Sequence, residues 1–162
     1  MVDMFLADAA ATAALAEALA ATQPASAAVH LHGDLGAGKS TLARAWLRAL
    51  GVTGPVRSPT YTLVERYPLA TGGEALHLDL YRIGDAGELE FLGLDDADAR
   101  LWLVEWPERG LGALPGPDLE VHLCVEGDGR RCRLAFHGVA GDLWTAALDQ
   151  QRRLQGLPEP SP

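Results

Sequence analysis

The chain has 162 residues, of which 48% are hydrophobic, a length that accommodates one compact domain with its own core but not two domains of ordinary size. Its 13 basic and 22 acidic residues give a formal net charge of −9, which argues against broad, unassisted contact with nucleic-acid phosphates, DNA included. The sequence has no basic segment leading into an apolar run and no apolar stretch approaching roughly 18 residues, so we expect no signal peptide, no membrane span and a cytoplasmic location.

The first predicted elements are a helix, a strand and a second helix. Residues 8–21 are rich in Ala and Leu without Gly or Pro, and they predict a helix that ends at Gln23-Pro24. Residues 27–31 predict a buried strand. After a glycine-rich turn, residues 39–50 carry apolar pairs four positions apart and stop at Gly51, which predicts another helix.

The middle of the chain predicts strands. Residues 60–67 are β-branched and aromatic, and turn residues then lead to a second strand at 75–81. In that strand three leucines face one way, and His77, Asp79 and Tyr81 face the other. Residues 88–94 predict a short helix. The near-continuous apolar run at 101–106 is typical of a strand covered on both faces in a parallel sheet.

The last part of the chain predicts an antiparallel hairpin and a helix. Residues 119–126 and 130–137 flank the turn Gly127-Asp128-Gly129, and residues 142–154 predict the helix. The proline-rich residues 155–162 predict a disordered tail, which leaves a domain at 1–154. Together these elements predict an α/β fold with a mostly parallel sheet flanked by helices.

The cysteines and histidines do not predict a metal site. Cys124 and Cys132 lack CxxC spacing and clustered histidines, so we expect free thiols. The histidines have no HxxxH or comparable spacing, and we expect each to be a strand or loop residue rather than a ligand. They are His30, His32, His77, His122 and His137.

The segment HGDLGAGKST at 32–41 contains the chain's one lysine and fits the P-loop pattern GxxxxGK[ST]. For this composition, a chance match is expected about once in a thousand sequences. In such a loop, backbone N–H groups surround the phosphates, the lysine reaches the outer phosphates and the hydroxyl ligates Mg²⁺. The residues expected to bind nucleotide here are Gly33, Asp34, Leu35, Gly36, Ala37, Gly38, Lys39, Ser40 and Thr41. The α/β chain is therefore predicted to be a P-loop NTPase domain.

Two carboxylates are candidates for completing a magnesium site. Glu105 follows the apolar run 101–104, a placement like that of a Walker B acid at the carboxyl edge of the sheet. Asp79 lies among the polar residues of its predicted strand, where a buried carboxylate needs a cation or hydrogen bonds. The alternatives are a surface acid at a strand end for Glu105 and a hydrogen-bonded structural residue for Asp79.

Three further features suggest site residues. The loop RSPTYT at 57–62 follows the P-loop helix, where nucleotide switches often supply a hydroxyl, although it can equally be a loop that enters a strand. Trp106 is either a core residue or lies at the mouth of the site. The arginines 130, 131 and 133 either offer charge to phosphates or belong to a solvated hairpin.

The sequence also favours ATP over GTP. Because Lys39 is the single lysine, the chain cannot contain the [NT]KxD motif with which GTPases recognise guanine.

The P-loop is followed in order by SPTYTLVE at 58–65, HLDLYR at 77–82 and VEWP at 104–107. With these four motifs the chain resembles the TsaE (YjeE) family, bacterial ATPases needed for threonylcarbamoyl modification of the tRNA adenosine next to the anticodon. The resemblance covers about residues 27–137. It implies a small P-loop fold that binds ATP and Mg²⁺, hydrolyses ATP weakly until partners stimulate it, and acts on TsaD and TsaB, with tRNA reached only through that complex.

The resemblance also implies roles for individual residues. It implies that Ser40 and Glu105 hold the magnesium and that Asp79 supports the metal or the attacking water. The switch-like loop contains Thr60 and Thr62, and activity depends on Trp106. The nucleotide is approached by Arg130 and, near the adenine, by Thr12. The sequence departs from the family at Ser40, where threonine is usual, and over residues 1–26.

Two other functions stay open on the residues alone. A small-molecule kinase shares the P-loop, but it needs an acceptor pocket and usually an arginine-bearing lid, and the arginines at 130–133 form a short hairpin. A nucleotide-gated binding protein with negligible turnover has the same phosphate motif. Free phosphate release, with and without partner proteins, separates all three functions.

Overall fold

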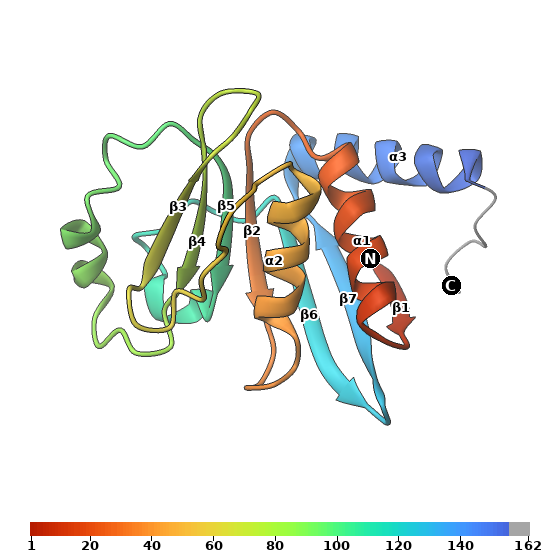
Figure 1. The fold of residues 1–162 in the computed structure, drawn as a ribbon, viewed down its shortest axis with the longest axis horizontal. Helices are drawn as coiled ribbons and strands as arrows, with labels where there is room; N and C mark the ends of the chain where they lie inside the picture. Colours follow the sequence, from red (N-terminus) through yellow and green to blue (C-terminus); the bar gives the residue numbers. More distant parts are fainter. Residues whose placement is uncertain (156–162) are drawn as a thin grey trace.

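Seven strands form one mixed sheet in the order β1-β7-β6-β2-β5-β4-β3 in the computed structural model, which describes residues 1–155 (Figure 1). The central strands β6, β2, β5 and β4 run parallel, whereas β1, β7 and β3 pair antiparallel at the two sides. The chain is a single α/β domain, as predicted. The strands are β1 (Val2–Leu6), β2 (Ala27–His32), β3 (Val64–Pro68), β4 (Glu74–Asp79), β5 (Ala99–Glu105), β6 (Leu119–Glu126) and β7 (Gly129–Phe136).

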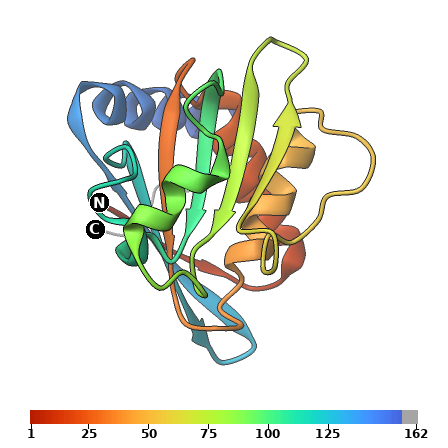
Figure 2. The same ribbon diagram turned by 90° about the vertical axis from the view of Figure 1, so that its left-hand side faces the viewer.

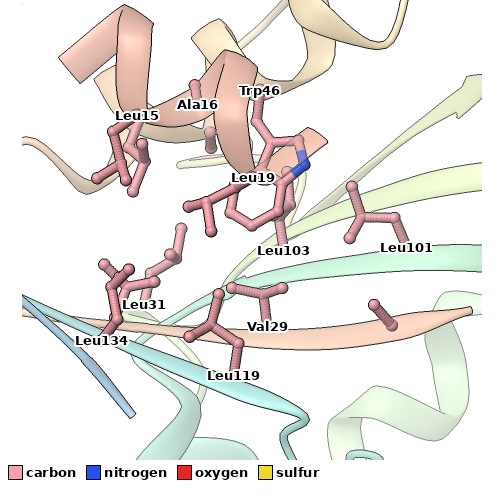
Figure 3. Close-up of a cluster of buried hydrophobic side chains, with 14 of the residues drawn as sticks. Leu15, Ala16, Leu19, Val29, Leu31, Trp46, Leu101, Leu103, Leu119 and Leu134 are labelled. Carbon is pink, nitrogen blue, oxygen red and sulfur yellow. The ribbon is translucent and has the colours of Figure 1, made fainter. Parts of the chain in front are cut away.

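One face of the sheet is covered by α1 (Ala9–Thr22) and α2 (Lys39–Ala49), and α3 (Gly138–Leu154) packs against α1 and β7. Leucines of α1 and Trp46 of α2 meet the apolar side chains of β2, β5 and β6 in a closed cluster (Figure 3). Trp46 and Trp144 of α3 meet edge to face at 5.9 Å between ring centroids. Each leucine buried in this way contributes about 1.5–3 kcal/mol, so the cluster fixes α2 firmly against the sheet.

The opposite face carries a second, smaller core over β4 and β5. Leu76 and Leu78 of β4 project into it and meet Leu89 of η1, a 3-10 helix at Ala86–Leu92. A second 3-10 helix, η2 (Pro107–Gly110), follows β5 directly. Figure 2 shows η1 and α2 on opposite sides of these strands. Because both faces of β5 are covered, its nearly continuous apolar sequence is explained.

Several predicted boundaries are wrong in position. The predicted strand at 60–67 starts only at Val64, because residues 60–63 form a turn closed by the Leu63 N–H donating to the Pro59 carbonyl (2.9 Å). The predicted strand at 75–81 ends at Asp79, and the predicted helix at 88–94 is the 3-10 helix η1. The last helix begins at Gly138 instead of 142, since tertiary packing of Trp144 overrides the low propensity of two early glycines.

Strand β1 was not predicted at all. Its five residues are too few to show a clear hydrophobic period, and its stability comes from pairing with β7, more than 120 residues later in the chain, from Val2↔Leu134 to Leu6↔Arg130.

Residues 156–162, which contain most of the predicted tail, lie outside the described part of the chain. Within residues 1–155, no helix is long and apolar enough to cross a membrane. Cys124 is exposed, Cys132 is buried, and both are free thiols as predicted.

Gly33 connects β2 to the glycine-rich loop at a point where a side chain has no room. A Cβ built on it would lie 2.5 Å from the Leu123 carbonyl oxygen, and its φ of +149° disfavours an L residue. We expect Gly33→Ala to lower the free energy of unfolding by about 2–4 kcal/mol, as measured by urea denaturation. Gly127→Ala is the matched control, because Gly127 also has positive φ but faces open space, and it should cost only about 1–2 kcal/mol. Equal costs for the two variants would contradict the close approach at Gly33.

Candidate nucleotide site

The loop between β2 and α2 lies at the carboxyl edge of the parallel strands, below β2 in Figure 1. Gly36 and Gly38 adopt φ values of 81° and 106°, and α2 starts immediately after Gly38. The N–H groups of the first helical turn have no intrahelical acceptors, so the loop and helix present backbone donors and the positive end of the helix dipole together. The predicted strand–loop–helix context is therefore present.

Lys39 is buried, with 5% of its surface exposed, and its ammonium group spans the loop that precedes it. The Nζ atom donates to the carbonyl oxygens of Gly33 and Asp34, the latter at 3.0 Å. It also lies 4.5 Å from the ring centroid of Trp106. Since Lys39 forms no ion pair among residues 1–155, its charge is held in place without being neutralised.

Glu105 ends β5 with its carboxylate 3% exposed and hydrogen bonded from two sides. The Ser40 hydroxyl lies 3.0 Å from both carboxylate oxygens, and His77 Nε2 lies 2.7 Å from Oε2. An ionised carboxylate only accepts hydrogen bonds, so His77 donates through Nε2–H. The Nδ1 atom of His77 is buried and has no partner in the described residues. The alternative that Glu105 is a solvated surface acid is wrong.

Asp79 lies beside Glu105 because the two are register partners at the ends of β4 and β5. It is 8% exposed, and its Oδ1 accepts the Tyr81 N–H at 3.0 Å. Burial raises the pKa of Asp79 and is the largest effect. The Tyr81 N–H opposes it, the neighbouring charge of Glu105 raises the pKa further, and His77 and Lys39 lower it by smaller amounts. Two adjacent, largely buried carboxylates and a hydroxyl form an oxygen-rich set of the kind that Mg²⁺ prefers.

The raised pKa of Asp79 predicts a stability effect. Between the ordinary Asp pKa of 3.8 and the raised pKa of Asp79 in the folded protein, Asp79 is protonated in the folded state and ionised in the unfolded chain. The free energy of unfolding therefore falls as the pH rises through this range. We expect Asp79→Asn to raise the urea midpoint of the magnesium-free protein at pH 7 and the difference to disappear below the ordinary Asp pKa. Asp85→Asn is the control, since Asp85 is exposed. An Asp79→Asn midpoint below that of the unmodified protein at pH 7 would contradict the prediction.

A cavity of about 280 Å³ joins the loop to these carboxylates. A second cavity of about 220 Å³ adjoins it, shares Gly38, Thr41 and Arg130 with it, and includes Thr12. The first cavity is lined by Leu35, Gly36, Gly38, Lys39, Ser40, Thr41, Thr60, Asp79, Tyr81, Glu105, Trp106 and Arg130. The cationic end of the first cavity suits the phosphates of a nucleotide, and the adjoining second cavity, lined in part by Leu6, Ala9 and Leu123, suits its base.

Arg130 is the hairpin arginine that faces the loop. Its guanidinium group donates to the Ala37 carbonyl at 3.0 Å and the Gly36 carbonyl at 3.2 Å. By contrast, Arg131 pairs with Glu126 and Asp3, and Arg133 lies 3.7 Å from Asp3. Arg130 therefore lies at the nucleotide loop, whereas Arg131 and Arg133 belong to the solvated hairpin.

The predicted switch loop reaches the cavity only in part. Thr60 lines it, and its hydroxyl bonds with that of Ser58 at 2.7 Å. The Thr62 hydroxyl instead donates to Glu65 at 3.0 Å on the exposed side, and Thr62 is not among the lining residues. Trp106 lines the cavity in a left-handed backbone conformation (φ 56°), with its ring 4.9 Å from that of Tyr81.

Sequence reasoning missed two residues of the site, His77 and Tyr81. The available signal was the alternation of β4, which places His77 on the same sheet face as Asp79. The register could not be known before the structure placed β4 next to β5, where His77↔Leu103 and Asp79↔Glu105 pair.

This geometry is that of a P-loop protein of the α/β class. A family model described as "Threonylcarbamoyl adenosine biosynthesis protein TsaE" matches residues 6–133, and the chain therefore belongs to the TsaE family. It is 49% identical over 109 residues to the tRNA threonylcarbamoyladenosine biosynthesis protein TsaE of Haemophilus influenzae, covering 65% of this chain and 68% of that protein. The Bacillus subtilis protein of the same name is 36% identical over 127 residues, covering 74% and 75%.

The fold has a counterpart among solved structures. The crystal structure of Bacillus subtilis YdiB superposes with a TM-score of 0.75 and 26% sequence identity, and the match covers 93% of this chain and 97% of YdiB. The resemblance stated from the four motifs is thus confirmed by family, relatives and fold.

Proposed function

We propose that this protein binds ATP with Mg²⁺ and hydrolyses it as an accessory ATPase in the threonylcarbamoyl modification of the tRNA adenosine next to the anticodon. The observation that carries the proposal is the contact between the Ser40 hydroxyl and both oxygens of Glu105, beside a buried, unneutralised Lys39. A hydroxyl and a carboxylate that can ligate a metal ion, and a cation that can bind phosphate, thus lie at one edge of the sheet, which supports the proposal.

The residues present fit magnesium. Three side chains that converge beside Lys39 from the ends of β4 and β5 and the start of α2 offer oxygen: Ser40, Asp79 and Glu105. When bound, Mg²⁺ neutralises charge on the phosphate oxygens as a Lewis acid. Ser40 and Glu105 would hold it directly, while Asp79 would orient the attacking water or complete the ligand set.

The remaining side chains position these groups. His77 holds Glu105 Oε2 at 2.7 Å, which fixes the carboxylate toward Ser40. The loop N–H groups and Lys39 would bind the phosphates, and the ring of Trp106 covers the ammonium group of Lys39 on one side. Hydrolysis by this set rests on positioning and electrostatics and uses no covalent intermediate with the protein.

We further propose that TsaD and TsaB are the partners and that they dock at the rim of this cavity in the cytoplasm. Leu35 lines the cavity and is 67% exposed, and Tyr61, which follows the lining residue Thr60, is 81% exposed. The Arg82 guanidinium lies over the Tyr61 ring at 4.6 Å, so this part of the rim offers aromatic and cationic contacts, which are enriched in protein interfaces. The net charge of −9 favours contact with tRNA through these proteins instead of directly.

The test is to measure ADP and free phosphate from Mg-ATP with the protein alone and with purified TsaD and TsaB. We expect slow release alone and at least about tenfold faster release with both partners. Phosphate transferred to an added metabolite would support a kinase instead. Bound nucleotide without any phosphate release in the presence of partners would support a nucleotide-gated binding protein.

A further inference from the structure

Four of the five histidines gather on the side of the sheet that lies away from α1 and α2: His30, His32, His122 and, through its contact with Glu120, His137. Val29 and Leu31 of β2 enter the helix-side core, so the alternate residues His30 and His32 face the other way. On β6, Glu120 and His122 share that face for the same reason. Since β2 and β6 are parallel neighbours, His30 pairs with Glu120 and His32 with His122 in register.

Three of these residues present metal-ligating atoms to one another. One ligand atom from each of His32, Glu120 and His122 lies within 4.8 Å of the other two. The rings of His32 and His122 stack at 4.4 Å between centroids with 7° between planes, and His32 Nε2 lies 3.0 Å from Glu120 Oε1. Spacing along the sequence does not reveal this cluster, because His32 is separated from the other two by almost 90 residues. His32 and His122 are strand residues, as expected, and the sheet brings their ligand atoms together with that of Glu120.

We propose that His32, Glu120 and His122 form a binding site for a divalent transition-metal ion, with Zn²⁺ the best match to two imidazoles and one carboxylate. The site is separate from the nucleotide cavity, because Glu105 and Asp79 lie on the helix side of the sheet. Three protein ligands leave one position of a tetrahedral ion open to water or another ligand.

The ligand-atom distances are close to what zinc requires, but the stacked rings of His32 and His122 have to turn relative to each other on binding, because an imidazole holds a metal ion in its own ring plane. Ligands about 2.0–2.1 Å from a tetrahedral ion are about 3.3 Å from each other. The His32 and Glu120 atoms at 3.0 Å therefore have to separate slightly, and the widest pair has to close by no more than about 1.5 Å. Side-chain torsions can supply this movement because His32 and Glu120 are about one quarter exposed and His122 is exposed.

The surroundings favour metal binding. The second carboxylate oxygen of Glu120 accepts from His137 Nε2 at 2.8 Å, a contact that orients the carboxylate in the way that outer hydrogen bonds orient metal ligands. A metal ion binds the neutral form of an imidazole, and the register partner of His122 on β7 is Arg133. The Arg133 guanidinium beside it lies 3.7 Å from Asp3, which offsets part of its charge.

The test is calorimetric titration of ZnCl₂ into the full chain with excess Mg²⁺, added to compete for the carboxylates of the proposed nucleotide site. We expect one Zn²⁺ per chain and at least about tenfold weaker binding in His122→Gln and in Glu120→Gln. Cys124→Ser is the matched control, because Cys124 is an exposed thiol two residues from His122, and it should leave the affinity unchanged. The melting temperature of each metal-free variant verifies folding.

Substitution of Co²⁺ for zinc provides a second measurement. We expect visible d–d absorption of a nitrogen- and oxygen-ligated ion without a thiolate charge-transfer band, and we expect it to weaken in His122→Gln. The proposal is overturned if the unmodified chain binds no zinc, if His122→Gln and Glu120→Gln bind it normally, or if Cys124→Ser abolishes binding. None of these outcomes depends on ATP hydrolysis.

Discussion

Replacing Lys39 with methionine is expected to weaken ATP binding about 100-fold, equivalent to about 2.8 kcal/mol. Methionine keeps most of the buried stem and removes the charge. The ammonium group is held over the loop by the Gly33 and Asp34 carbonyls and by the face of Trp106, so its position is fixed before the ligand arrives. A preorganised, largely desolvated cation interacts with phosphate more strongly than a solvated one.

Calorimetric titration of ATP into the Lys39→Met protein provides the measurement. Arg131→Gln is the control, since it removes the same unit of charge from an exposed position paired with Glu126 and Asp3, and it should change affinity by less than about twofold. The Lys39→Met substitution leaves the carbonyls of Gly33 and Asp34 without their lysine donor, so the melting temperature of the nucleotide-free protein is measured in parallel. Unchanged ATP affinity in a folded Lys39→Met protein would remove the lysine from the phosphate site.

The features of the sequence that act locally predict the site well. The P-loop spacing places Gly36, Gly38 and Lys39 within one turn, and the two glycines allow the positive φ values that this turn requires. The apolar run of β5 predicts that Glu105 lies at a strand end, because a carboxylate is unfavourable in the middle of a strand covered on both faces.

Features that depend on strand order could not be predicted in the same way. Asp79 and Glu105 become neighbours only because β4 lies next to β5, and His32 meets His122 only because β6 lies on the other side of β2. Strand β1 similarly gains its partner from β7 at the opposite end of the chain. The turn at 60–63, which directs Thr60 toward the cavity and Thr62 away from it, depends on the positive φ of Leu63, a residue with no sequence preference for it.

Glu105→Gln is expected to lower magnesium-dependent ATP hydrolysis in the presence of TsaD and TsaB by about 10²–10³-fold. Glutamine preserves the shape and can still accept hydrogen bonds from Ser40 and His77, but it lacks the negative charge that a divalent cation requires. Nucleotide affinity measured without magnesium should change by less than about threefold, since Lys39 and the loop N–H groups bind the phosphates independently. The loss is therefore expected in turnover and in the magnesium dependence of binding.

Glu108→Gln is the matched control for this prediction. Glu108 lies three residues further on, in η2, and is exposed. The Glu108→Gln variant loses the same charge as Glu105→Gln, and we expect it to retain hydrolysis within about twofold. If Glu105→Gln hydrolyses ATP normally, the acid does not hold the metal, and the contacts of Glu105 with Ser40 and His77 are structural. If Glu105→Gln loses magnesium-free ATP affinity as strongly as Lys39→Met, the carboxylate instead maintains the conformation of the loop through Ser40. Turnover and magnesium-free affinity measured on the same preparations thus assign Glu105 to the metal, to the loop or to neither.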